Sequence, residues 1–285
     1  MRRTIKSLAM ALLMIFMVAG CTGHLKPISG IVKKPAVVQT APSAVQMLRS
    51  VVRITGGGTG VVVAKTGNQT LILTAWHVVK KFVGPAQING KEITFPKMKR
   101  IPVKVVMMDD LGNVVLRKSY SGDIDTNSLN NDLALIKVKA RLPSAVALVA
   151  RRLPRFGDVA WVIGHPFGRY EYTITKGIVS HPQQRIKQGL FSYKTYMQIS
   201  SGVVPGNSGG PVFNHNGRVS GIVVGVFRMG FSMVPHLGFA VPLSHVKAFL
   251  DGSSAMKKLK APKPKPKLKP QPKKKQVEKN GKKSN

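Results

Sequence analysis

The chain has 285 residues, and its 45 lysines and arginines outnumber its 10 acidic residues, which gives a formal net charge of +35. A single cysteine excludes any intrachain disulfide, so a folded domain must rest on its hydrophobic core. A charge of this size favours anionic partners.

The first 20 residues have the pattern of a bacterial export signal. Positive residues in Met1–Lys6 precede an apolar run from Leu8 to Val18, which is too short to span a bilayer comfortably. Val-Ala-Gly-Cys (18–21) resembles a lipobox, in which the cysteine is lipidated and the chain is cut before it. We expect residues 1–20 to be a lipoprotein signal peptide and Cys21 to anchor the protein in the cell envelope, facing the periplasm or the exterior. A plain cleaved signal and an uncleaved anchor are the alternatives.

Residues 21–45 contain several prolines without a regular period, and we expect them to form a tether. Short β-branched runs then recur between turn residues, which predicts an all-β domain over residues 46–250. Only Leu243–Leu250 has a helical pattern, and the basic segment Lys91–Lys104 is expected to be a surface loop. The predicted strands are Val51–Ile54, Gly60–Ala64, Leu71–Leu73, Val103–Met107, Val114–Arg117, Leu133–Val138, Val159–Gly164, Tyr172–Ser180, Tyr196–Ile199, Val212–Phe213, Val219–Phe227 and Gly238–Val241.

Three polar residues beside apolar runs could together form a nucleophilic site. His77 follows the run Leu-Ile-Leu-Thr-Ala-Trp (71–76), and Asp132 precedes Leu-Ala-Leu-Ile-Lys-Val (133–138). Ser208 lies in Pro-Gly-Asn-Ser-Gly-Gly-Pro (205–211), whose small residues let main-chain N–H groups point at one spot. A serine hydroxyl needs a base for its proton and donors for the oxyanion that it creates. The order His, Asp, Ser is that of the chymotrypsin template.

Each of these residues alone is a weak signal. A histidine after a strand is usually structural, and Asn-Asp is usually a turn. Asp123 and Asp125 are rival acids by position, but neither directly precedes an apolar strand. The combination and order of the three residues therefore carry the argument.

The segments around these residues resemble those of trypsin-like serine proteases of the HtrA (Deg) family over about residues 46–250. The resemblance implies an all-β fold of two six-stranded Greek-key barrels with a short C-terminal helix and the catalytic site in the cleft between the barrels. The matching segments are Thr-Ala-Trp-His-Val-Val (74–79), Asn-Asp-Leu-Ala-Leu-Ile-Lys (131–137), Ile-Gly-His-Pro-Phe-Gly (163–168), Ile-Thr-Lys-Gly-Ile-Val-Ser (174–180) and Leu-Gly-Phe-Ala-Val-Pro (237–242).

The resemblance also implies a role for each site residue. Ser208 would be the nucleophile, His77 the general base and acid, and Asp132 the residue that orients the imidazole, with the N–H groups of Gly206 and Ser208 as the oxyanion hole. Protein or peptide substrates are implied, an oligomer is allowed, and no cofactor is needed. Asn207 stands where digestive relatives carry an aspartate that pairs with a newly cut N-terminus. Packing, a ligand or an oligomer must therefore order this loop.

The family pattern places the substrate pocket at four residues, Gly202, Val203, Val224 and Val226. None of them is acidic, so lysine and arginine would find no partner there. We expect a preference for small or medium apolar side chains.

Two features depart from the family pattern. His77 and Asp132 lie 55 positions apart, and we expect the excess length in exposed loops within Lys80–Arg100 or Ser119–Asn131. Residues 251–285 are too few for the PDZ modules that HtrA proteases usually carry. Their Lys-Pro-rich composition predicts a disordered basic tail.

Residues 257–285 hold thirteen lysines and one glutamate, which leaves +23 of the +35 for the rest of the chain. The tail could bind an anionic envelope surface or could simply be solvated. A nucleic-acid partner is disfavoured because no aromatic interleaving accompanies the lysines. His165 in the Gly-His-Pro turn is interpreted as structural. The remaining scattered histidines, without a neighbouring cysteine, disfavour a metal site.

Three functions are compatible with these patterns. The first is a serine endopeptidase of the bacterial cell envelope, which the intact triad favours. The second is an envelope-tethered binder or holdase with the protease fold and secondary or no catalysis. The third is a tethering protein whose basic arm matters most.

Overall fold

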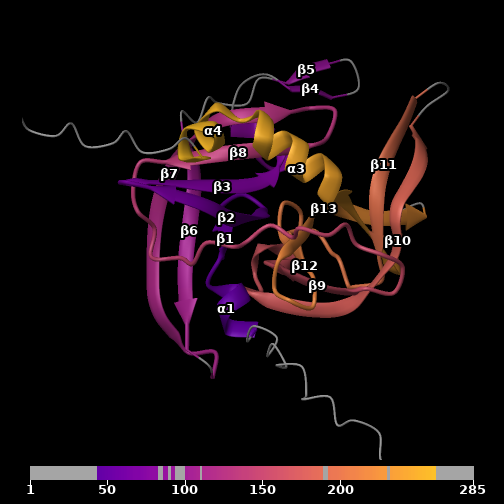
Figure 1. The fold of residues 1–285 in the computed structure, drawn as a ribbon, viewed down its shortest axis with the longest axis horizontal. Helices are drawn as coiled ribbons and strands as arrows, with labels where there is room; N and C mark the ends of the chain where they lie inside the picture. The colour runs from indigo at the N-terminus through magenta and orange to yellow at the C-terminus, as the bar shows by residue number, and fades with distance from the viewer. Residues whose placement is uncertain are drawn as a thin grey trace, which may run out of the picture. The chain divides into compact units, whose positions relative to one another are not determined.

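The structure is a computed structural model that describes residues 44–82, 86–88, 91–93, 100–109, 111–188, 192–229 and 232–260. The predicted signal peptide, Cys21 and most of the predicted tether and tail lie outside the described residues. Two closed antiparallel barrels of six strands each make up the described domain (Figure 1). The predicted fold class is therefore confirmed.

The first barrel has the strand order β1-β2-β3-β8-β7-β6. The order departs from the sequence because β8 returns to pair with β3, which is the Greek-key connection. Its strands are β1 (Val51–Ile54), β2 (Gly58–Thr66), β3 (Gln69–Ala75), β6 (Ile101–Met108), β7 (Val114–Ser128) and β8 (Leu133–Val138).

The second barrel repeats this topology in the order β10-β11-β14-β13-β12-β9. Its strands are β9 (Val159–Gly164), β10 (Thr173–Gln188), β11 (Ser192–Ile199), β12 (Pro211–Phe213), β13 (Val219–Met229) and β14 (Ser232–Pro242). The remaining elements are α1 (Ala44–Leu48), α2 (Trp76–Val79), η1 (Lys80–Phe82), β4 (Ala86–Ile88), β5 (Lys91–Ile93), η2 (Pro166–Gly168), α3 (Leu243–Gly252) and α4 (Ser254–Lys260).

The strands that face both the barrel interior and the other barrel are apolar on both sides. In β3, Leu71 and Leu73 belong to a cluster shared by the two barrels, whereas Ile72 packs inside the first barrel. In β12, Phe213 joins the shared cluster and Val212 packs inside the second barrel. Because successive side chains alternate between the two faces of a strand, continuous apolar runs are needed here. The shared cluster fixes the two barrels against each other.

Two expectations about the connections were wrong. Ser119–Ser128, expected within an exposed loop, belongs to the 15-residue strand β7, because these residues pair with β6 and β8. The segment Lys91–Lys104, expected as a loop, contains β5, which pairs with β4, and the start of β6. The predicted spacing excess thus lies partly in a long paired strand and partly in a β4–β5 hairpin.

The predicted start of the disordered tail, at residue 251, is wrong because the folded domain extends further. The helix predicted for Leu243–Leu250 is present as α3 but ends at Gly252, and α4 follows within the segment expected to be disordered. Ala255 and Met256 of α4 pack against the shared apolar cluster, which supplies the reason for order. The rest of the predicted tail lies outside the described residues. Within the described part of the chain, no helix has the length and apolar character that crossing a membrane requires.

Candidate active site

Strand register brings His77 next to Asp132. In the antiparallel pair β3–β8, Ala75 at the end of β3 lies opposite Leu133 at the start of β8. The next residues outward are Trp76 and Asp132, and the N–H of Trp76 donates to the carbonyl of Asp132 at 3.0 Å. The turn α2 then carries His77 one residue further, over the carboxylate.

Asp132 holds His77 through both of its carboxylate oxygens. Oδ2 lies 2.6 Å from Nδ1 of the ring, and Oδ1 accepts the main-chain N–H of His77 at 2.8 Å. The aspartate has a left-handed backbone with φ of 52°, a conformation that aspartate adopts more readily than most residues. Because the carboxylate of Asp132 only accepts, Nδ1 of His77 carries the proton and donates it. In the neutral ring Nε2 is then unprotonated and available as a base.

The two rival acids both lie near Lys137 in the first barrel. Asp125 forms an ion pair with Lys137 at 3.0 Å, and its side chain is almost fully buried. Asp123 lies opposite Lys137 in the β7–β8 ladder. Among the described residues, neither carboxylate bonds to His77, so the geometry favours Asp132.

The loop that carries Ser208 belongs to the second barrel but rests on the first. The carbonyl of Ser208 accepts the N–H of Thr59, in β2, at 2.9 Å. A Cβ at Gly209 would collide with Thr74 and with the carbonyl of Thr59, so only glycine fits there. Because Thr74 lies three residues before His77, the main chain of the serine loop lies beside the end of β3.

The hydroxyl of Ser208 is bonded within its own barrel in this conformation. Its Oγ donates to the carbonyl of Val224 at 3.3 Å, and the described residues contain no hydrogen bond between Ser208 and His77. The structure therefore brings His77 and Asp132 together and docks the serine loop near them without closing the third contact. Catalytic hydrogen bonds are often long or absent before a substrate binds.

The two predicted oxyanion donors are unused within the described part of the chain. The N–H groups of Gly206 and Ser208 donate to no described residue, whereas Asn207, between them, donates to the carbonyl of Val204 at 3.1 Å. The carbonyls that precede both free groups are held: Pro205 accepts from Phe167 at 2.6 Å and Asn207 accepts from Gly210 at 2.9 Å. In a trans peptide the N–H points opposite to the carbonyl. Both N–H directions are therefore fixed by bonds on the other side of the loop.

Asn207 is buried, with 3% of its surface exposed, against the backbone of Gly164. Its Oδ1 has no hydrogen-bond partner among the residues that the structure describes. Packing on the second barrel, rather than an ion pair, thus holds the side chain next to the serine.

Two of the predicted pocket residues are part of the second barrel's packing. Val203 is buried in the core of this barrel, and Val226 packs against the same cluster. The carbonyl of Gly202 accepts the hydroxyl of Thr175 at 2.9 Å, and Val224 packs against the shared and first-barrel clusters. A Cβ at Gly238 would come within 2.8 Å of Val203, so these two positions lie in contact. The predicted preference for small apolar side chains stays a prediction.

A different cavity borders the acid of the pair. It has a volume of about 350 Å³ and includes none of the four predicted pocket residues. Burial, followed by the nearby charge of Asp132, raises the pKa of Tyr196, one of its lining residues. The lining residues are Asn130, Asn131, Asp132, Tyr193, Lys194, Thr195, Tyr196, Val241 and His245.

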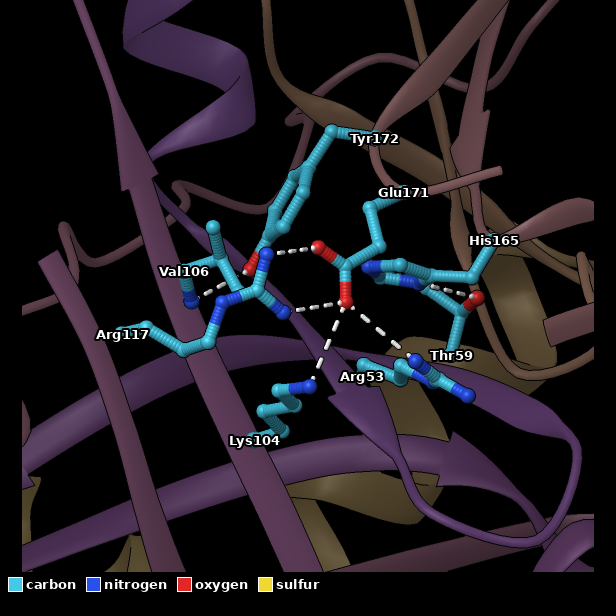
Figure 2. Close-up of polar contacts among 8 residues, drawn as sticks. All are labelled: Arg53, Thr59, Lys104, Val106, Arg117, His165, Glu171 and Tyr172. Carbon is cyan, nitrogen blue, oxygen red and sulfur yellow. Dashed lines mark hydrogen bonds and ion pairs between the residues drawn. The ribbon is translucent and has the colours of Figure 1, made fainter. Parts of the chain in front are cut away.

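The segment from His165 to Tyr172, here called the bridging segment, joins the serine loop to the first barrel (Figure 2). The hydroxyl of Tyr172 accepts the N–H of Val106 at 3.0 Å and donates to the carbonyl of Val51 at 3.2 Å. Glu171 forms ion pairs with three cations of the first barrel, Arg53 at 3.2 Å, Lys104 at 3.5 Å and Arg117 at 2.9 Å. No local sequence pattern predicts these contacts, because they join residues that are distant in the sequence.

Burial dominates the electrostatics of the bridging segment. It lowers the pKa of His165 to about 3, helped by the positive charge of Arg53, so the ring is neutral at physiological pH. It raises the pKa of Tyr172 to about 12. Burial also opposes ionisation of Glu171, but the hydrogen bond and charge of Arg117, together with Lys104, hold the pKa of Glu171 below its usual range.

Comparisons with known proteins agree with this geometry. The family described as trypsin-like peptidase domain matches residues 58–222, which include His77, Asp132 and Ser208. The chain belongs to the trypsin-like peptidase family, a family of serine endopeptidases.

Individual proteins named as DegP-like or HtrA-like match parts of this chain. A probable periplasmic serine endoprotease, DegP-like, of Pseudomonas putida is 32% identical over 154 residues, which are 52% of this chain and 30% of that protein. A serine protease of Staphylococcus aureus, HtrA-like, is 26% identical over 72% of this chain and 24% of its own. The chain thus spans a quarter to a third of the length of these curated relatives. The HtrA-type protease AlgW, solved with a tripeptide, shares the fold with a TM-score of 0.54 at 24% identity, covering 73% of this chain and 61% of that one.

Proposed function

We propose that this protein is an HtrA-type serine endopeptidase that hydrolyses peptide bonds through His77, Asp132 and Ser208 and a covalent acyl-enzyme. The observation that carries the proposal is the 2.6 Å bond between Asp132 and the Nδ1 of His77. Beside it lies a serine loop with two N–H groups that donate to none of the described residues. Membership of a peptidase family supports the same reaction.

In the proposed mechanism, rotation about the Cα–Cβ bond of Ser208 breaks its bond to the Val224 carbonyl and turns the hydroxyl toward His77. Nε2 of His77 takes the hydroxyl proton as Oγ attacks the substrate carbonyl, and Asp132 stabilises the imidazolium. The N–H groups of Gly206 and Ser208 bind the oxyanion. His77 then returns the proton to the leaving amine, and water hydrolyses the acyl-enzyme by the same route.

A fluorophosphonate probe tests the nucleophile directly, because it labels only an activated serine. We expect the purified protein to be labelled and the Ser208→Ala variant to remain unlabelled. Ser220→Ala is a matched control, since Ser220 is buried and its hydroxyl also donates to a carbonyl, that of Val212 at 3.1 Å. Labelling that survives in Ser208→Ala would contradict the assignment of the nucleophile.

The bond from Ser208 to Val224 favours one alternative, a protease-fold binder or holdase with secondary or no catalysis. A protein that never activates its serine would give no labelling in the wild type and would still bind unfolded substrates. Holdase activity is measured by suppression of aggregation of a model substrate.

Envelope location and lipid anchoring form a separate part of the proposal. They rest on the export-signal pattern and on the periplasmic location in the name of the Pseudomonas relative. A clickable fatty acid should label the wild type in cells and should not label Cys21→Ser. Labelling of that variant would exclude Cys21 as the anchor.

The basic tail is proposed to bind an anionic envelope surface. Its lysines are tested best by deleting residues 261–285, because α4 ends at Lys260 and packs on the domain. The deletion should weaken binding to vesicles that contain anionic lipid, with little effect on neutral vesicles. Unchanged binding would indicate that the tail is merely solvated.

A further inference from the structure

Two consecutive hydrogen bonds link the bridging segment to the oxyanion loop. The hydroxyl oxygen of Thr59 lies 2.7 Å from the carbonyl oxygen of Gly206 and 3.0 Å from Nδ1 of His165. Thr59 is fully buried and His165 is 1% exposed, so water cannot replace either bond without opening the domain. Figure 2 shows the ring of His165 directed at the side chain of Thr59.

The direction of both bonds follows from the chemistry of the groups. A carbonyl only accepts, so the hydroxyl of Thr59 gives its single proton to Gly206. Nδ1 of His165 must then donate to the same hydroxyl oxygen, which makes the ring a neutral Nδ1–H tautomer. Its Nε2 is then the unprotonated nitrogen, and it is buried without a hydrogen-bond partner among the described residues.

Thr59 holds both residues that form the proposed oxyanion hole. Its hydroxyl binds the carbonyl of Gly206, and its main-chain N–H binds the carbonyl of Ser208 at 2.9 Å. On the other side, the N–H of Phe167 binds the carbonyl of Pro205, which precedes Gly206. The two peptide planes that meet at Gly206 are therefore both held. The plane that contains the Gly206 N–H is held through the Pro205 carbonyl, and the next plane is held through the Gly206 carbonyl.

We propose that Thr59 and His165 are positioning residues for the oxyanion hole. His165 orients the hydroxyl of Thr59, and this hydroxyl holds the Gly206 carbonyl so that the Gly206 N–H stays directed at the substrate oxygen. The inference rests on the proposed function, because an oxyanion hole matters only to a chain that performs acyl transfer. It assigns catalytic importance to a histidine that the sequence indicated only as structural.

Thr59→Val is the sharpest test, since valine keeps the shape of threonine and lacks the hydroxyl. Loss of a whole oxyanion donor costs about 10²–10³ in kcat, and a donor that is present but misdirected should cost about 10- to 100-fold. The affinity for a peptide boronate, whose oxygen occupies the oxyanion hole, should fall by the same factor. KM and the affinity for a cleaved product peptide should change less than about threefold.

Conservative variants at the same two positions should retain activity. Thr59→Ser keeps the hydroxyl, and His165→Asn places an amide donor near the position of Nδ1. Both should retain kcat and boronate affinity within about threefold of wild type, whereas His165→Leu should lower both. The ratio of boronate to product-peptide affinity is measured on folded, binding-competent protein, so a loss of folded material does not imitate the predicted change.

Thr70→Val is the matched control. Thr70 is also fully buried in the first barrel, and its hydroxyl donates to the carbonyl of Ala140 at 2.8 Å. This variant should lower the thermal midpoint about as much as Thr59→Val and leave the affinity ratio unchanged. If the wild type is active and Thr59→Val keeps the wild-type ratio of boronate to product-peptide affinity, the inference about Thr59 and His165 is overturned, while the proposed function stands. A wild type that neither hydrolyses peptides nor labels with fluorophosphonate would overturn the proposed function itself.

Discussion

The two halves of the candidate site are built in different ways. His77 and Asp132 lie on one barrel, and the register of β3 and β8 places them together. The loop of Ser208 belongs to the other barrel, yet its position depends on Thr59 and the end of β3 in the first barrel and on the bridging segment. The acid–base pair is thus a local product of strand pairing, whereas the nucleophile loop depends on contacts with both barrels.

This difference indicates where the site should be easy to disturb. A pair held by a β-ladder keeps its geometry as long as its own barrel is folded. A loop held by a few bonds from several distant segments can lose its geometry while both barrels remain intact. The following predictions test this contrast, from the largest expected effect to the smallest.

Asp132→Asn should have the largest effect on turnover. Asparagine keeps the shape and the acceptor for the His77 N–H but cannot hold the ring in the Nδ1–H tautomer, so kcat should fall by about 10⁴-fold. The circular dichroism spectrum and melting temperature should change little. Asp125→Asn is the control. It removes the carboxylate charge that pairs with Lys137, and it should leave kcat near the wild-type value. Equal losses in the two variants would contradict the choice of Asp132 as the orienting acid.

Gly206→Ala should disturb the loop without unfolding the barrels. Gly206 has φ of 100°, and a Cβ there would collide with the carbonyl of His165. The loop must shift, and we expect kcat to fall by about 10²–10³-fold, as for loss of an oxyanion donor. Gly157→Ala is the matched control, because its φ is 78° and its Cβ would meet no atom within 4 Å. Peptide hydrolysis that is unaffected by Gly206→Ala would show that the loop tolerates movement.

Glu171→Gln should weaken the attachment of the bridging segment. The variant leaves Arg53, Lys104 and Arg117 close together without their carboxylate, and we expect it to lower the free energy of unfolding by about 2 kcal/mol. Because the pKa of Glu171 is lowered by folding, its contribution is present above the usual value of 4.5 and disappears as the pH falls through the lowered pKa. The difference between the two proteins in chemical denaturation should therefore shrink at low pH.

Asp158→Asn is the matched control for the ion pairs. Asp158 pairs with the half-exposed Arg152 at 2.8 Å, and removal of such a surface pair should cost less than about 1 kcal/mol. If the two variants lost equal stability, the bridging segment would contribute no more than an ordinary surface ion pair.

His165 should make the free energy of unfolding depend on pH in the mildly acidic range. The unfolded chain binds a proton at this histidine below about 6.5, whereas the folded protein resists protonation down to about 3. Stability from this group is therefore complete above pH 6.5 and is lost as the pH falls toward 3, by about 2 kcal/mol at pH 5. His165→Asn should remove this part of the difference between unfolding at pH 7.5 and at pH 5. An identical pH dependence in both proteins would contradict a buried, neutral His165.

Much of this protein could be predicted from its sequence because the decisive signals are local. Each of the twelve predicted β-branched runs overlaps one of the twelve barrel strands, with only Tyr172 outside its strand, and a strand buried on both faces needs such a run. His77, Asp132 and Ser208 were found because their flanking segments are contiguous and specific. The glycines around Ser208 were also informative, since φ of 100° at Gly206 and 81° at Gly209 is costly for any other residue.

Tertiary structure decided the features that depend on partners distant in sequence. The length of β7 follows from pairing with β6 and β8, and the order of α4 follows from its packing on the shared cluster, neither of which has a local signature. His165 and Thr59 are 106 residues apart, so no local pattern could join them to Gly206. Short-range propensity and periodicity specify which segments become strands. The hydrogen bonds between barrels, which orient the oxyanion loop, exist only after those strands have closed and packed together.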